Sequence, residues 1–376
     1  MKVALAHKRL NLRGGTERDF YRTAEGLRDL GHEVHLFCGE YEIEPPVGTV
    51  AHRIPHLPLG RTAALWSFAL SAPRLIRERR CDVVINFGRM FRQDVLRSGG
   101  GSHRGFLRKL SQEFGPWRRL WHSVSIYHQS LLAMEKQQFS AGHFKRILAV
   151  SEQVKRELIA TYDVNENLIT VLYNGVDQDR FHPSLREKWR AAMRNLWGIP
   201  IEVPLILFVG SGFRRKGLDR LLNAWGSPRL RGSYLLIVGE DARLGAFRAR
   251  AEKIAPGRIV FAGRQDQIEK YYGAADLLAL PAVQEAFGNV VLEALASGVL
   301  VVVSRGVGAA EVLRGRLNEG IVDQPEDPKE LEDKVVSMIS HCSDPDLKLA
   351  ARTIGERYSW AHHFQRLEAC LLELCQ

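Results

Sequence analysis

The sequence predicts an α/β protein built from two doubly wound, Rossmann-like domains in tandem. A chain of 376 residues is long enough for two hydrophobic cores, since single cores usually stop growing well before that length. Short apolar or β-branched runs alternate along it with helical segments, as is typical of parallel βα units. The alternation pauses after residue 168 and restarts at residue 205, so we expect two sheets.

Nine short runs are the predicted strands. They are residues 2–7, 33–37, 82–87 and 146–151 in the first domain and 205–210, 234–240, 258–263, 276–281 and 299–304 in the second. The stretch 168–184 contains turn residues and a proline, and it is the predicted crossover between domains. We therefore expect domains at 1–168 and 169–358. We expect an amphipathic helix at 359–376. Whether it packs on the second domain or crosses back to the first stays open.

Composition restricts the class of protein. The five cysteines are scattered, odd in number and without a CxxC pair, so neither a disulfide framework nor a zinc site is indicated. No apolar run approaches the roughly 18 residues of a membrane span, and the N-terminus returns to charge too soon for a signal peptide. These features predict a protein of the reducing cytoplasm.

The net charge of +10 is unevenly placed. Residues 1–166 contain 26 Lys and Arg against 17 Asp and Glu, which leaves 27 against 26 for the rest of the chain. This asymmetry predicts that the first domain meets something anionic, which can be a membrane surface, nucleic acid or a phosphorylated substrate.

Each predicted domain opens with a strand, a glycine-bearing loop and a helix. In the first, Gly14 and Gly15 would let a phosphate approach the unpaired N–H groups at the helix start. Thr16 and Asp19 have the spacing of a capping box. Paired glycines also make an ordinary βα turn, so this loop alone leaves both interpretations open.

The second loop is more specific, because Arg214, Arg215 and Lys216 crowd together where a helix begins. Cations at that end of a helix are opposed by its dipole by ~0.3–1 kcal/mol, and an anionic ligand would offset this. Arginine can grip a phosphate with two hydrogen bonds, and lysine adds a point charge. The alternative is a solvated run of surface charge.

Two carboxylates stand in a strand, loop and helix near the end of the second domain. Glu285 falls in the loop and Glu293 in a helix starting near Gly288, which places them on the order of 10 Å apart. A retaining hydrolase needs ~5 Å between its two acids. The spacing instead suits two hydroxyl-bearing groups, and a nucleotide sugar would satisfy both acids and the basic loop. The alternative is that both acids serve the helix dipole.

These motifs resemble those of the retaining nucleotide-sugar glycosyltransferases of family 4, and the resemblance covers nearly the whole chain. It implies the GT-B fold, in which two Rossmann-like domains face each other across a cleft. By this resemblance the domain at 1–168 faces the acceptor and the membrane, and the domain at 169–358 binds the nucleotide sugar. Glu285 and Glu293 fit the family's E-x7-E motif, in which the first Glu addresses the donor sugar and the second the ribose. Arg215 and Lys216 fit its basic pair on the donor diphosphate.

The resemblance implies further site residues. His103 falls where related enzymes place a histidine near the donor sugar, so we group it with Glu285, Arg215 and Lys216 as catalytic. The other donor contacts that it implies are Gly14, Gly15, Arg180, Arg264, Gly288 and Asn289.

The resemblance also implies a mechanism without a cofactor. Arg215 and Lys216 would stabilise the departing diphosphate in place of a metal. Two D-x-D triplets, at 177–179 and 344–346, fit a crossover and a helix start better than a cation site. Retention of configuration is implied by the family alone, and we expect it to proceed by front-face displacement.

Within the family, segments 14–20, 86–95 and 210–220 look closest to the glucosyltransferases of the lipopolysaccharide core, which move glucose from UDP-glucose to an inner-core heptose. We therefore expect hexose transfer to a lipid-linked saccharide. Another donor, such as GDP-mannose or UDP-N-acetylglucosamine, with a different glycolipid or polysaccharide acceptor stays open. So does a non-catalytic basic protein that binds membranes or nucleic acid.

The basic excess of the first domain has a focus in residues 103–122, where arginines and lysine alternate with aromatic side chains. This pattern suits the interface of an anionic bilayer, and it predicts peripheral attachment to the cytoplasmic face of the inner membrane. The predicted membrane-binding residues are Arg104, Phe106, Arg108, Lys109, Trp117, Arg118, Arg119 and Trp121. A helix packed on its own domain is the alternative. No nucleic-acid motif accompanies the pattern, so we expect no nucleic-acid partner.

Overall fold

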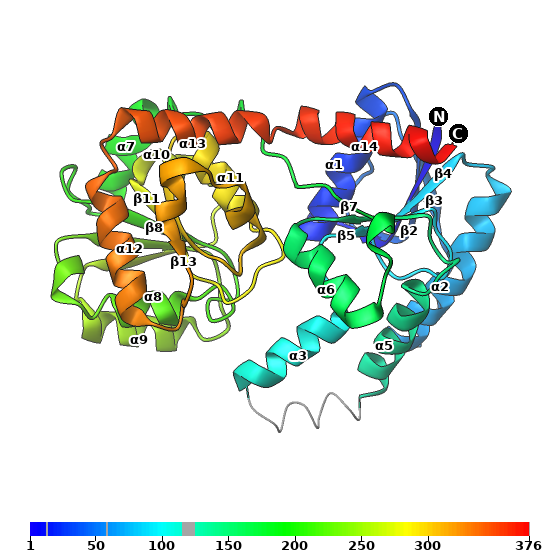
Figure 1. The fold of residues 1–376 in the computed structure, drawn as a ribbon, viewed down its shortest axis with the longest axis horizontal. Coiled ribbons are helices and arrows are strands. Elements are labelled where there is room, and N and C mark those ends of the chain that lie inside the picture. The colour runs from blue at the N-terminus through cyan, green and yellow to red at the C-terminus, as the bar shows by residue number, and fades with distance from the viewer. Residues whose placement is uncertain (13, 58, 115–124, 376) are drawn as a thin grey trace. The chain divides into compact units, whose positions relative to one another are not determined.

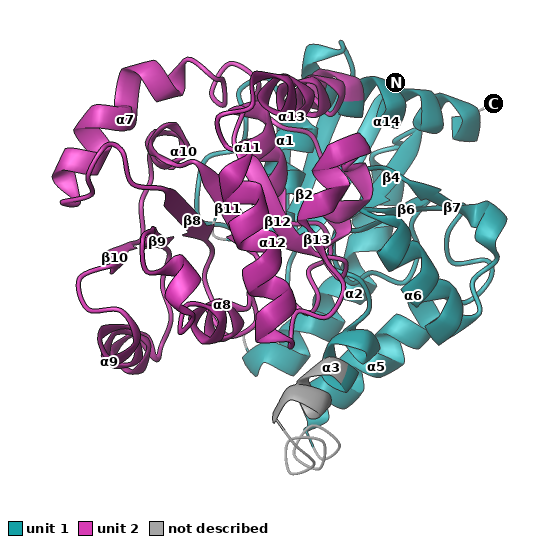
Figure 2. Cartoon of the chain, turned by 60° about the vertical axis from the view of Figure 1, so that its left-hand side comes forward, with its two compact units in different colours: residues 1–173, 363–376 teal, residues 174–362 magenta. Residues whose placement is uncertain are grey.

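The computed structural model describes residues 1–375 except 13, 58 and 115–124, and it describes the backbone but not the side chains of residues 109–114. The chain divides into two compact units (Figure 2). Residues 1–173 and 363–376 form the first unit, and residues 174–362 form the second. None of the described helices combines the length and the apolar character needed to cross a bilayer.

The first unit has a seven-stranded parallel sheet in the order β3-β2-β1-β4-β5-β6-β7 (Figure 1). Its strands are β1 Lys2–Leu10, β2 Glu33–Tyr41, β3 Val50–Arg53, β4 Val83–Asn86, β5 Val95–Ser98, β6 Arg146–Ala149 and β7 Ile169–Val171. Its helices are α1 Gly15–Asp29, α2 Gly60–Glu78, α3 His103–Phe114, α5 Ile126–Gln138, α6 Glu152–Tyr162, η1 Glu166–Leu168 and most of α14 Trp360–Cys375. The strand order reverses between β1 and β4, which is where doubly wound sheets bind ligands.

The second unit has a six-stranded parallel sheet in the order β10-β9-β8-β11-β12-β13. Its strands are β8 Leu205–Val209, β9 Tyr234–Val238, β10 Ile259–Gly263, β11 Leu277–Leu280, β12 Leu300–Ser304 and β13 Ile321–Val322. Its helices are α7 Leu185–Leu196, α8 Leu218–Ala224, η2 Pro228–Leu230, α9 Leu244–Ile254, α10 Glu269–Ala274, α11 Asn289–Ala296, η3 Gly308–Val312, η4 Gly315–Gly320, α12 Pro328–Ser340 and α13 Pro345–Arg357. Here the order reverses between β8 and β11.

The predicted fold class is confirmed, and all nine predicted strands are present. Four strands lie outside the nine predicted ranges. β5 is an inner strand, but it has only four residues, of which two are Arg97 and Ser98, so it carries little apolar signal. The other three, β3, β7 and β13, lie at the outer edges of their sheets. Edge strands pair on one side only and can be short, so their sequences carry little apolar periodicity. Because β7 pairs with β6, the stretch 168–184 begins with a strand of the first sheet, and the units divide after Tyr173.

The end of the chain completes the core of the first unit. Leu367, Cys370 and Leu371 of α14 are buried in the same cluster as residues of β1 and α1. α14 packs closely on α1, because a Cβ atom added at Gly26 would lie 2.2 Å from the Phe364 ring. Burial of the apolar stripe of α14 therefore stabilises an element that is remote in sequence.

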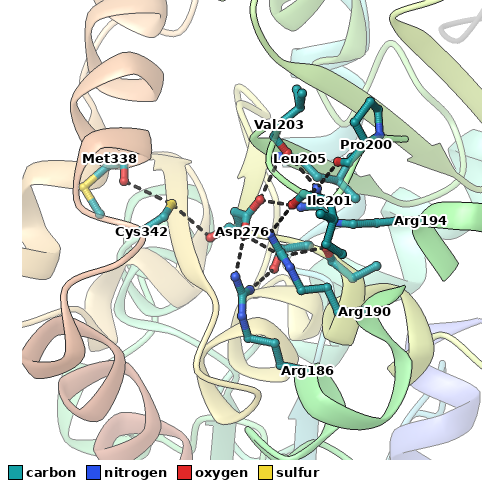
Figure 3. A network of polar contacts seen from close by, with 12 residues as sticks. Arg186, Arg190, Arg194, Pro200, Ile201, Val203, Leu205, Asp276, Met338 and Cys342 are labelled. Carbon is teal, nitrogen blue, oxygen red and sulfur yellow. Dashed lines mark hydrogen bonds and ion pairs between the residues drawn. The ribbon is translucent and has the colours of Figure 1, made fainter. Parts of the chain in front are cut away.

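A charged network holds α7 to the amino end of β11 in the second unit (Figure 3). Asp276 precedes β11 and pairs with three arginines of α7, at 3.0 Å for Arg186, 2.8 Å for Arg190 and 2.5 Å for Arg194. The arginines also donate to carbonyl oxygens of residues 200, 201, 203, 274 and 275. The three guanidinium groups are thus engaged by the fold itself.

Candidate active site

The loops that follow β8 and β11 bring together the predicted diphosphate and sugar residues of the second unit. Lys216 Nζ lies 2.7 Å from Glu285 Oε2, and Arg215 Nη1 lies 2.5 Å from the same oxygen. Because β8 and β11 are neighbours, their carboxyl ends place both loops at the reversal of strand order. The predicted trio of Arg215, Lys216 and Glu285 therefore forms one cluster.

A glycine makes this close approach possible. Gly217 has a φ of 86° and immediately precedes α8. A Cβ atom at this position would lie 2.1 Å from the Pro281 carbonyl oxygen, so any side chain would push the two loops apart. The glycine next to Lys216 thus sets the distance between the basic loop and Glu285.

Burial and charge act in opposite directions on Glu285. Burial alone would raise the pKa of its carboxyl, but Lys216 and Arg215 outweigh it and hold the pKa below its usual value. Burial lowers the pKa of the Lys216 ammonium, and Glu285 opposes that effect. The site therefore contains an ionised carboxylate facing two cations, of which Arg215 is 51% exposed.

Glu293 lies in α11, and Gly288 with a φ of 93° precedes the helix as predicted. The buried Tyr272 hydroxyl donates to Glu293 Oε2 at 2.8 Å, and Glu293 acts electrostatically on Lys216. Asn289 at the helix start accepts a hydrogen bond from the Asn174 amide at 2.8 Å. The E-x7-E pair thus lies beside the basic loop, with one acid before the helix and the other within it.

The described interactions of the other two charged donor contacts that we predicted, Arg180 and Arg264, do not involve this cluster. Arg180 pairs with Glu269 at 2.8 Å and donates to the Asp266 carbonyl oxygen at 3.0 Å. Arg264 is exposed in the segment after β10. The assignment of both residues to the donor stays a prediction.

The first unit contains a cavity of about 350 Å³ at its own reversal of strand order. Its walls come from β1, the first turn of α1 and the segments 87–89 and 96–103, with Phe139. His103 lines this cavity, and its Nε2 lies 3.0 Å from Nδ1 of His128, whose ring it stacks on. The predicted histidine is therefore part of a pocket.

A buried carboxylate that the sequence analysis missed fixes the backbone at His103. Glu135 of α5 is 0% exposed and accepts hydrogen bonds from the His103 and Arg104 backbone N–H groups at 2.6 and 3.0 Å. It also accepts from Arg89 at 2.7 Å and from the Tyr162 hydroxyl at 2.5 Å. Glu135, which belongs to α5, thereby pairs with backbone N–H groups at the N-terminus of α3, where a negative charge is favourable. In the sequence, Glu135 is the one acidic residue of α5, and nothing else marks it.

The glycine loop of the first unit precedes α1 as predicted, with Gly14 at the N-cap position and Gly15 opening the helix. The Glu17 carboxylate folds back over this turn, since a Cβ atom at Gly14 would lie 2.1 Å from Glu17 Oε2. The neighbouring His7, whose Nε2 lies 3.9 Å from Glu17 Oε1, is the main cause that lowers the pKa of Glu17. One of the chain's own carboxylates thus lies at the helix N-terminus where we expected a phosphate.

The predicted capping box at Thr16 and Asp19 is wrong. Gly14 has no side-chain cap, and Thr16 lies inside α1. Asp19 is buried and accepts a hydrogen bond from Arg97 Nε at 2.9 Å. Asp19 does not cap the helix, because its carboxylate pairs with Arg97 of β5 instead.

The predicted membrane-binding segment is described in part. It begins as α3, where Arg104, Phe106 and Arg108 are exposed. Lys109 lies in α3 with its side chain outside the description. The remaining members lie outside the described residues and are Trp117, Arg118, Arg119 and Trp121.

Comparison with known proteins agrees with this geometry. A model of glycosyltransferase family 4 matches residues 13–180, and a model of the group 1 glycosyl transferases matches residues 203–341. The chain belongs to the family 4 glycosyltransferases. It is a hexosyltransferase of the GT-B fold, and the two matched segments correspond to its two units.

Individual relatives refine the comparison. Lipopolysaccharide glucosyltransferase WaaG of Escherichia coli K12 is 29% identical to this glycosyltransferase over 328 residues, which are 85% of this chain and 84% of that one. A crystal structure of WaaG superposes with a TM-score of 0.79 at 23% identity, covering 98% of this chain and 99% of that one. HepE of Anabaena in complex with UDP-glucose superposes with a TM-score of 0.70 at 18% identity, covering 99% and 100%. The two structures show the shared fold.

Proposed function

We propose that this glycosyltransferase moves glucose from UDP-glucose, with retention of configuration, onto a lipid-linked saccharide such as the heptose of the lipopolysaccharide core. The observation that carries the proposal is the cluster of Arg215, Lys216 and Glu285 at the reversal of strand order. The WaaG relative is a lipopolysaccharide glucosyltransferase, and HepE of the same fold binds UDP-glucose, which supports this donor and acceptor.

In the proposed reaction the donor diphosphate replaces the Glu285 carboxylate at Arg215 and Lys216. Glu285 then becomes available to accept hydrogen bonds from the donor sugar, and Glu293 from the ribose. As the bond between the anomeric carbon and phosphate oxygen breaks, the two cations stabilise the charge that builds on the diphosphate. Their fixed positions supply this stabilisation without a metal.

The acceptor hydroxyl attacks the anomeric carbon from the face that the diphosphate leaves. Its oxygen forms the new glycosidic bond, and its proton passes to the departing phosphate oxygen. His103, held through its backbone by Glu135, faces the cavity of the first unit and is assigned to the donor sugar. Isolation of a glycosyl-enzyme adduct would overturn this front-face route.

The test is transfer by the purified protein to heptose-terminated core oligosaccharide, with UDP-glucose, GDP-mannose and UDP-N-acetylglucosamine offered separately. We expect one added hexose from UDP-glucose by mass spectrometry, with an anomeric configuration that NMR shows to match the donor. Preference for another donor would replace UDP-glucose in the proposal. No transfer from any nucleotide sugar, together with retention on anionic vesicles or nucleic acid, would favour a non-catalytic binding protein.

We also propose that α3 attaches the protein peripherally to the cytoplasmic face of the inner membrane, close to a lipid-linked acceptor. Exposed Arg104, Phe106 and Arg108 support this, because basic residues near an anionic surface contribute about 1 kcal/mol each. Flotation with anionic and zwitterionic vesicles at low salt tests it. We expect binding to anionic vesicles that R104E/R108E weakens, and equal binding to both vesicles would contradict the proposal.

A further inference from the structure

The backbone at the start of α3 is held by carboxylates from two other helices. Glu135 of α5 accepts hydrogen bonds from the His103 and Arg104 N–H groups at 2.6 and 3.0 Å. Glu157 of α6 accepts from the Ser102 N–H and from the Ser102 hydroxyl, both at 2.8 Å. Negative charge is favourable at a helix N-terminus, and here two acids of the chain supply it. The fold itself therefore fixes the backbone of residues 102–104.

The imidazole ring of His103 is held as well. Its Nε2 lies 3.0 Å from Nδ1 of His128, and the two rings are inclined by 14° with their centroids 5.2 Å apart. The Phe106 ring lies 6.0 Å from the His103 ring at 27°. Two neutral imidazoles can share one proton in such a contact, in which one nitrogen donates and the other accepts. His128 therefore restricts both the orientation of the His103 ring and the nitrogen that carries its proton.

Both contacts to His103 come from α5. His128 and Glu135 are seven residues apart, which is about two helical turns, so their side chains project from the same face of the helix. One regular element thereby sets the ring and the backbone of the same histidine. Catalysis needs such fixed geometry, because a displacement of about 1 Å can lower a rate on the order of 10²-fold.

Each carboxylate oxygen of Glu135 meets two donors. Oε1 accepts from the His103 N–H and, at 2.7 Å, from Arg89. Oε2 accepts from the Arg104 N–H and, at 2.5 Å, from the Tyr162 hydroxyl. A glutamine of the same shape would turn its NH2 group towards one of these pairs, so a backbone contact is lost whichever way the amide lies. The side chain is 0% exposed, so water does not replace that contact.

We infer that His128 and Glu135 are positioning residues of this glycosyltransferase, which hold the ring and the backbone of His103 in the orientation that transfer requires. His103 lines the cavity of the first unit, whereas His128 and Glu135 are not among the described residues that line it. Both therefore act through His103. The inference rests on the proposed assignment of His103 to the donor sugar, and it adds two residues from a helix outside the sequence motifs of the site.

The first experiment measures kcat and the KM for UDP-glucose in E135Q and H128L. We expect each variant to lower kcat about tenfold and to keep this KM within about twofold, because the proposed diphosphate contacts lie in the second unit. H128N is the conservative variant, since its amide can replace the Nδ1 contact to His103. It should keep kcat within about threefold of wild type. An H128N variant as slow as H128L would overturn the role of His128.

The matched control is D94N. Asp94 is also a carboxylate of the first unit that accepts from a backbone N–H, that of Val84 at 3.0 Å, and pairs with a cation, Lys145 at 3.0 Å. D94N should lower Tm and leave kcat unchanged, because its described contacts do not reach His103. A loss of kcat in D94N equal to that in E135Q would overturn the inference.

A double-mutant cycle separates positioning from a general structural role. In the H103A background, E135Q and H128L should lower kcat no further, because the ring that they orient is absent. Losses of kcat that add in the double variants would overturn the inference. Should E135Q fail to fold, as judged by its Tm, the comparison of H128L with H128N in both backgrounds still decides it.

The NMR signals of the His103 imidazole give a readout that needs no substrate. We expect them to shift in H128L and E135Q and to keep their wild-type positions in D94N. Should wild-type protein transfer nothing from UDP-glucose, the proposed reaction fails, while these shifts still support the positioning of His103 by α5. Unchanged signals in both H128L and E135Q would overturn the positioning itself.

Discussion

The second unit contains two clusters in which one carboxylate faces several cations, and they lie at opposite ends of its strands. Asp276 and three arginines of α7 lie at the amino end of β11, whereas Glu285 with Arg215 and Lys216 lies at the carboxyl ends of β11 and β8. The arginines around Asp276 are also engaged by backbone carbonyl oxygens. Half of the Arg215 side chain is exposed to solvent.

The same residue types therefore serve different purposes. At Asp276 the acid and the carbonyl oxygens satisfy the cations, so the network stabilises the fold. At Glu285 the acid pairs with the basic loop, and in the proposed reaction the donor diphosphate replaces it there. The partners of a cluster, and the end of the strands at which it lies, distinguish structure from function here.

The largest expected effect breaks the structural cluster. D276N leaves three arginines without their counter-charge, and we expect it to lower the free energy of unfolding by about 3–5 kcal/mol. Activity per folded molecule should not change. The control is D323N, which removes an exposed pair with Arg305 and should cost less than ~1 kcal/mol in denaturant unfolding. Equal losses of unfolding free energy in D276N and D323N would show that the Asp276 network stabilises the fold no more than an exposed ion pair does.

Removal of the lysine tests the functional cluster. We expect K216A to lower kcat/KM for UDP-glucose by about 10²–10³, because it removes a cation aimed at the developing charge. R214A, one residue before Arg215, should stay within a few-fold of wild type in the same assay. An active K216A enzyme would refute the assignment of the basic pair to the diphosphate.

The first unit buries an ionisable group in its neutral form, in contrast to the two charged clusters of the second unit. His363 donates from Nδ1 to the Tyr173 carbonyl oxygen at 2.6 Å, and burial lowers the pKa of this histidine to about 4. As the pH falls, His363 is protonated near pH 6.5 in the unfolded chain but stays neutral in the folded chain until about pH 4. Stability present above pH 6.5 is therefore lost as the pH falls towards 4, by roughly 3 kcal/mol. H363N, whose amide can donate in the same way, should show a shallower loss in denaturant unfolding, and parallel pH curves would contradict this.

The smallest expected effect separates the two roles of Glu285. E285Q removes the resident anion, so UDP should bind about fivefold more tightly, on the order of 1 kcal/mol for a partly exposed pair. Hexosyl transfer should fall at the same time, because the donor sugar loses its carboxylate. Calorimetric titration with UDP measures the first effect. Weaker UDP binding in E285Q would show that no exchange of anions occurs.

The candidate site residues of the second unit were easier to predict from the sequence than those of the first. Arg215, Lys216, Glu285 and Glu293 are charged, lie in two continuous segments and follow two strong strands, so their grouping was predictable. Glu135 contacts His103 through long-range packing, and a single acid in a helix gives no local signal in the sequence. Asp19 of α1 was misassigned for the same reason, because its partner Arg97 lies on β5, far away in the sequence.

The position of α14 has a consequence for how the protein is made. Leu367 and Leu371 complete the first core, yet they follow the whole of the second unit along the chain. The half that leaves the ribosome first must therefore wait, with an apolar surface uncovered, until the other half has been synthesised. Nascent chains that stop short of α14 would hold a finished second unit and an unfinished first one, which makes the N-terminal half the natural client of chaperones.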